Sequence, residues 1–119
     1  MEYNYQKENG LRYTRIPVEY KAVYYMGDIS GEGIITDISE GGIAMRVNQA
    51  FIVGDELAVE ANISSNLILK FTSEVRSIQG NMLGISIIEI DPDLKERFTS
   101  HIEGVLRMKK LDRREIFAE

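Results

Sequence analysis

An acid, a hydroxyl and a pair of glycines stand close together in the segment "DISEGG". Asp37 and Ser39 are two residues apart, so their side chains project from the same face of an extended strand, and the residue between them projects from the other. A carboxylate beside a hydroxyl can exchange hydrogen bonds with the N–H groups on the edge of a guanine base. Gly41 and Gly42 permit positive φ angles and leave room for a flat ligand near the backbone. The alternative is a hairpin whose glycine turn is capped by Asp37 and Ser39.

Two arginines lie upstream of that segment, in "LRYTRIPV". Arg12 and Arg15 stand where a polar N-terminal stretch meets the first alternation of apolar residues. Guanidinium groups bind phosphate through paired hydrogen bonds and stack on nucleobase faces. Lys7 and Lys21 make this region locally basic, so a small anionic ligand is compatible with it. Taken alone, the arginine pair also fits two solvated charges on a loop.

Alternating apolar and polar residues predict about six β-strands that would position these groups. The expected strands are IPVEYKAVYY (16–25), GIITDIS (33–39), GGIAMRV (41–47), DELAVEANI (55–63), LILKFTSEVRSI (67–78) and MLGISIIEI (82–90). MGDISGEG (26–33) is expected to form a turn, and Gly80-Asn81 marks another. Short turns without a helical period between the strands favour an antiparallel barrel or sandwich.

The end of the chain predicts a helix. Asp91 offers an N-cap, and Pro92 suits the first helical turn. Apolar residues then recur at spacings of three and four on one face: Leu94, Phe98, His101, Ile102, Val105 and Leu106. His101 is the single histidine of the chain, and its place on this face predicts a partly buried packing residue. We expect Gly104 to let the helix approach the barrel closely.

Composition excludes several classes of protein. The 119 residues are 44% hydrophobic and 28% charged, which is ordinary for one soluble globular domain. The net charge of −5 argues against binding DNA or RNA. The chain has no cysteine and one histidine, so the common zinc sites are not expected. The acidic residues form no convincing general acid–base pair, so we do not expect an enzyme. The first residues lack the apolar region of a signal peptide and no apolar run would span a membrane, which predicts a cytoplasmic protein.

The arginines and the DISEGG segment together resemble the PilZ domain, the bacterial receptor module for cyclic di-GMP. The family pattern is RxxxR in an N-terminal loop, a strand, and then [D/N]xSxxG about twenty residues later. Asp37, Ser39 and Gly42 match the second motif in full, and YTRIPV places Arg15 at the second arginine of the first motif. SEVRSIQGNMLGISI is similar to the closing hairpin of the family. The resemblance covers roughly residues 10–108.

The resemblance implies a mainly β fold, a six-stranded antiparallel PilZ-type β-barrel with a C-terminal α-helix. We expect a flexible N-terminal arm over residues 1–15, the barrel with its helix over residues 16–110 and a tail over residues 111–119. The implied ligand is cyclic di-GMP, with no cofactor and no metal. The implied binding residues are Arg12, Arg15, Asp37, Ser39, Gly41 and Gly42.

One departure from the family pattern concerns the first arginine. Leu11, not arginine, stands four residues before Arg15. Arg12 is expected to reach the same phosphate from the next position, with Lys7 as a further substitute. A lost charge-assisted contact weakens binding by about 1.5–3 kcal/mol, or about ten- to a hundredfold. The alternative is therefore a degenerate PilZ-fold interaction module that does not bind cyclic di-GMP.

The resemblance also implies a role in signalling. Ligand binding would order the N-terminal arm across the barrel and change the surface offered to another protein. With no effector domain in the sequence, the output is expected to pass through an unidentified effector protein, with this chain as a monomer or a homodimer. A small β-barrel enzyme or carbohydrate binder is the remaining rival, and it predicts that Asp37 matters while Arg15 does not.

Overall fold

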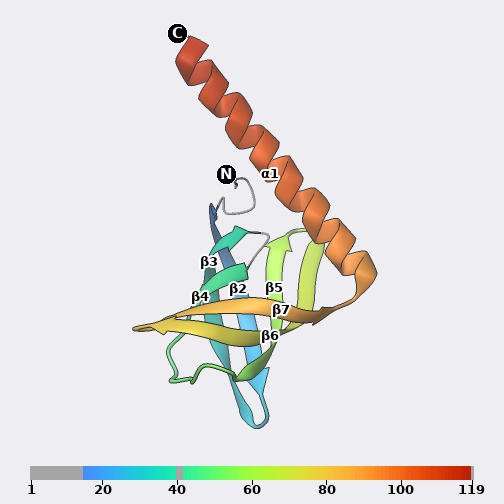
Figure 1. Cartoon of the computed structure of the whole chain (residues 1–119). Helices are drawn as coiled ribbons and strands as arrows, with labels where there is room; N and C mark the ends of the chain where they lie inside the picture. Colours follow the sequence, from blue (N-terminus) through green and yellow to red (C-terminus); the bar gives the residue numbers. More distant parts are fainter. Residues whose placement is uncertain (1–14, 40–41, 119) are drawn as a thin grey trace, which may run out of the picture.

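In the computed structural model, which describes residues 15–39 and 42–118, six antiparallel strands close into a barrel (Figure 1). The strands are β2 (Ile16–Met26), β3 (Ile29–Ser39), β4 (Gly42–Arg46), β5 (Glu56–Ser64), β6 (Leu67–Gln79) and β7 (Met82–Ile90). Their order around the barrel is β2-β3-β4-β7-β6-β5. The helix α1 (Pro92–Ala118) follows. The expected mainly β barrel with a C-terminal helix is confirmed.

Alternation along the strands builds the core. On β5, Leu57, Val59, Ala61 and Ile63 are buried and alternate with exposed residues. The facing strands contribute inward side chains in the same way, so the barrel interior is filled by aliphatic and aromatic groups. Burial of this apolar surface is the main force that closes the barrel.

The first hairpin is longer than the sequence predicted. Only Gly27 and Asp28 form the turn, and the residues from Ile29 onward already belong to β3. The prediction of a turn over residues 26–33 is wrong because Gly31 and Gly33 belong to β3. A Cβ at Gly33 would lie 2.9 Å from the carbonyl oxygen of Arg46, so glycine is required there by the neighbouring strand.

Helix α1 begins as predicted. Asp91 caps it, since its Oδ1 accepts a hydrogen bond of 2.8 Å from the N–H of Asp93. The helix continues through Ala118 and so includes residues 111–118 of the expected tail; no glycine or proline follows Gly104 to interrupt it. The expected close approach at Gly104 is wrong, because a Cβ there would meet nothing within 4 Å. The described part of the helix has no stretch apolar enough to span a membrane.

Candidate ligand-binding site

The residues expected to bind a ligand gather where three strands meet. Arg15 directly precedes β2, Asp37 and Ser39 lie at the end of β3, and Gly42 begins β4. The register pairs Pro17 with Asp37 and Ser39 with Gly42. Antiparallel pairing therefore brings Arg15 next to residues that follow it by more than twenty positions in the chain.

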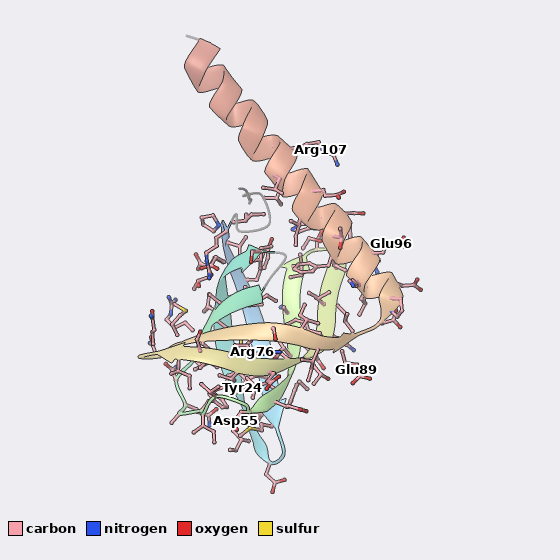
Figure 2. All side chains as sticks on the ribbon, viewed as in Figure 1. Tyr24, Asp55, Arg76, Glu89, Glu96 and Arg107 are labelled. Carbon is pink, nitrogen blue, oxygen red and sulfur yellow. The ribbon has the colours of Figure 1, made fainter. Side chains whose placement is uncertain are left out.

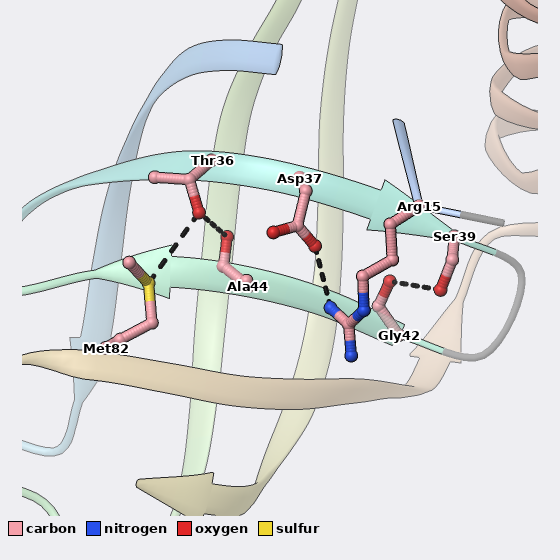
Figure 3. A network of polar contacts seen from close by, with 7 residues as sticks. All are labelled: Arg15, Thr36, Asp37, Ser39, Gly42, Ala44 and Met82. Atoms are coloured by element: carbon pink, nitrogen blue, oxygen red, sulfur yellow. Dashed lines mark hydrogen bonds and ion pairs between the residues drawn. The ribbon is translucent and has the colours of Figure 1, made fainter. Parts of the chain in front are cut away.

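Arg15 and Asp37 form an ion pair at this place. The Nη1 atom of Arg15 lies 2.8 Å from the Oδ1 atom of Asp37 (Figure 3). The Arg15 side chain is 68% exposed, whereas that of Asp37 is 26% exposed. The carboxylate is thus held against the barrel surface, and the guanidinium group covers it from the solvent side.

A β-bulge places Asp37 on the outer face. Ile35 and Ile38 are both fully buried, although a regular strand would point residues three apart to opposite faces. The register shifts between Ile35 and Asp37 in the pairing with β4, so Thr36 and Asp37 both fall between the two buried isoleucines. The spacing of the isoleucines was the signal for this bulge in the sequence. As predicted, Asp37 and Ser39 lie on the side opposite Ile38.

Thr36 is a member of this outer face that the sequence analysis did not single out. Its Oγ1 donates to the carbonyl oxygen of Ala44 at 3.5 Å and lies 3.6 Å from the sulfur of Met82 (Figure 3). Thr36 thereby ties β3 to β4 and β7 directly beside Asp37.

The hairpin between Ser39 and Gly42 combines both interpretations of the DISEGG segment. Ser39 Oγ donates to the carbonyl oxygen of Gly42 at 3.3 Å, as a capping side chain does (Figure 3). The hydroxyl donates its one proton in this bond, so it can still accept a hydrogen bond from a second partner. Hairpin capping and ligand binding are therefore compatible at Ser39.

Gly42 has a different reason for being glycine from the one expected. The described glycines with positive φ are Gly27, Gly54 and Gly80, and Gly42 is not among them. A Cβ on Gly42 would lie 2.9 Å from the carbonyl oxygen of Ile85 on β7. The missing side chain thus makes room for the neighbouring strand, and Gly42 does not use the positive φ that glycine permits.

Two of the expected binding residues, Arg12 and Gly41, lie outside the described residues, as do Leu11 and Lys7. In the part of the chain that the structure describes, no group of three or more His, Cys, Asp or Glu side chains could hold a metal ion. The described site is therefore an arginine–carboxylate pair beside a hydroxyl, where β3 ends and β4 begins. Such a group can bind an anion together with a hydrogen-bonding base edge.

Comparison with known proteins identifies the family. The family model of the PilZ domain matches residues 11–104. Among solved structures, the PilZ domain with c-di-GMP of YcgR from Escherichia coli superposes with a TM-score of 0.66 and 19% sequence identity, over 85% of this chain and 95% of that chain. The comparison with curated proteins found no match. Since the family model covers most of the chain and the barrel agrees, this chain belongs to the PilZ domain family.

Proposed function

We propose that this PilZ domain is a receptor for cyclic di-GMP. The observation that carries the proposal is the contact between Arg15 and Asp37, because it unites the two sequence motifs at one place on the barrel surface. Asp37 and Ser39 would bind the edge of a guanine base, and Arg15 would bind phosphate or stack on the base. The structural likeness to a PilZ domain solved with c-di-GMP supports the same ligand.

Arg15 is suited to change partners when the ligand arrives. Its side chain is largely exposed, and exposed ion pairs contribute only about 0–1 kcal/mol to stability. A phosphate offers a guanidinium group a bidentate, charge-assisted contact of the same kind. Exchange of the carboxylate for the phosphate therefore costs little free energy, and it would free Asp37 for the N–H groups of guanine.

The second arginine of the site would come from the N-terminal segment. We propose that Arg12 supplies it from the position after Leu11, and that residues 1–15 close over the ligand as they do so. The closed segment would present a new surface to an effector protein, so the domain would act as a non-enzymatic adaptor. Because cyclic di-GMP is a bacterial messenger, the setting would be the bacterial cytoplasm.

Isothermal titration of the full chain with cyclic di-GMP tests this function. Saturable heat is expected in the wild type, and Asp37→Ala and Ser39→Ala should each weaken binding by about tenfold or more. Asp28→Ala is the matched control, since Asp28 lies in the exposed turn between β2 and β3. Absence of heat at submillimolar ligand, with no chemical-shift change at Arg15 and Asp37, would rule the proposal out.

A second candidate is an interaction module that does not bind the nucleotide. Leu11 at the position of the first family arginine favours it, because the site would then lack one of its two cationic groups. This candidate predicts a folded barrel that gives no heat with cyclic di-GMP. The substitution Leu11→Arg separates the two ideas further, since a chain that lost binding only through this position should regain it.

A further inference from the structure

Helix α1 is held on the barrel by its first turns. Phe98 and Ile102 are buried in the core, and Leu94 and Val105 pack against it. Met108 is 66% exposed, and beyond it the helix leads away from the strands (Figure 1). Figure 2 shows Glu96 beside the barrel and Arg107 beyond it. The direction of the whole helix, about 40 Å long, is therefore set by a few contacts near its beginning.

One of these contacts is a hydrogen bond between side chains of the barrel and the helix. The hydroxyl of Tyr20 on β2 lies 2.9 Å from Nε2 of His101 on α1, and the two ring centroids are 6.1 Å apart. Both residues are partly buried. The phenol of Tyr20 is protonated at neutral pH, as for any tyrosine, and burial raises its pKa further. This bond is directional, as is the exposed hydrogen bond of 2.8 Å that Nη2 of Arg97 donates to the carbonyl oxygen of Asn66, whereas the apolar contacts of the helix tolerate small rotations.

Tyr20 is also the first regularly paired residue after a bulge in β2. Pro17 pairs with Asp37 and Tyr20 pairs with Ile35, so two residues of β2 lie opposite one residue of β3. A bulge increases the local twist and redirects the side chains that follow it. The direction of the Tyr20 side chain thus depends on the bulge, and the other flank of the bulge is the Pro17–Asp37 pair beside Arg15.

We propose that the Tyr20–His101 hydrogen bond couples the ligand site to helix α1. The inference rests on the proposed cyclic di-GMP binding and adds how binding would be transmitted. When Arg15 leaves Asp37 for the ligand, the start of β2 changes its contacts, and the bulge passes this change to Tyr20. The orientation of α1 on the barrel then changes through His101. The projecting half of the helix thereby becomes the element by which a partner protein distinguishes the bound state.

The single histidine gives a direct test, because the imidazole signals of the chain report on His101 alone. Long-range ¹H–¹⁵N spectra of the full chain are recorded without ligand and at saturating cyclic di-GMP, with saturation established by calorimetry for each variant. In the wild type, we expect the ring signals and the α1 backbone amides to shift. In Tyr20→Phe, which removes only the hydroxyl, this response should disappear although the ligand still shifts the amide of Asp37. Tyr25→Phe is the control, since Tyr25 is exposed on the same strand.

The outcomes separate the coupling from the binding. If saturating ligand leaves the His101 ring signals of the wild type unmoved, the coupling is overturned while the receptor function stands. An equal response in Tyr20→Phe also overturns it, because the hydroxyl would then be unnecessary. If calorimetry shows no binding at all, it is the proposed function that fails. The wild-type spectra alone can overturn the coupling, so the inference is testable even if Tyr20→Phe is poorly folded.

Discussion

Arg15 lies 2.8 Å from Asp37 across 22 residues of sequence, and it is the more exposed partner of the pair. The pair joins the start of β2 to the end of β3, close to the point where β4 begins. The Asp37 carboxylate is therefore already paired with a cation. A ligand that uses Asp37 must compete with Arg15 or provide Arg15 with a better partner.

The substitution Asp37→Asn should separate ligand binding from folding. It removes the charge that we propose accepts hydrogen bonds from the N–H groups of guanine, so affinity for cyclic di-GMP should fall by about ten- to a hundredfold. The free energy of unfolding should change by less than about 1 kcal/mol, because the ion pair is exposed. Calorimetry and urea unfolding measure the two effects. A large loss of stability without loss of affinity would contradict this assignment.

Arg12 is predicted to replace the missing first arginine of the family motif. Arg12→Ala should weaken binding by about ten- to a hundredfold, because one charge-assisted phosphate contact is lost. Lys7→Ala is the paired variant and should have little effect. If the calorimetric result is the reverse, the phosphate contact belongs to Lys7. If neither variant changes the affinity, Arg15 alone supplies the cation.

The strands and the helix start could be predicted because their signals are local. Alternation along β5, the Gly80-Asn81 turn and the Asp91 cap each act over a few residues, and the structure confirms them. The failures involve neighbours distant in sequence. Gly31 and Gly33 suggested a turn, whereas both lie within β3, and glycine at position 33 is required by the approach of Arg46 from β4.

The candidate site shows the same division between local signals and contacts that join residues distant in sequence. The projection of Asp37 and Ser39 from one face follows from their spacing, and the structure confirms it. The close approach of Ile85 to Gly42 depends on the closure of the barrel, so no local pattern reports it. The bond between Tyr20 and His101 joins residues 81 positions apart. For His101, a packing role was foreseeable, but the identity of its partner was not.

Gly42→Ala should destabilise the barrel itself. A Cβ 2.9 Å from the Ile85 carbonyl oxygen forces β4 and β7 apart, which should lower the free energy of unfolding by about 1–3 kcal/mol. Gly104→Ala is the matched control, because a Cβ there has open space within a helix and should raise stability by about 0.5–1 kcal/mol. Urea unfolding of both variants measures the difference. Equal stability of Gly42→Ala and the wild type would show that β7 can move away from the added Cβ at little cost in free energy.

The barrel should lose stability at alkaline pH through two phenols, the partly buried Tyr20 and the buried Tyr24. Burial raises the pKa of both Tyr20 and Tyr24 above the ordinary value of about 10. The unfolded chain therefore releases these protons at lower pH than the folded chain does. It follows that the stabilising contribution is complete below pH 10 and is lost as the pH rises through the folded pKa values. Urea unfolding midpoints between about pH 8 and pH 11 should fall in the wild type and fall less in Tyr20→Phe. If Tyr20→Phe shows the same dependence of the urea midpoint on pH as the wild type, the loss of stability at alkaline pH comes from other groups.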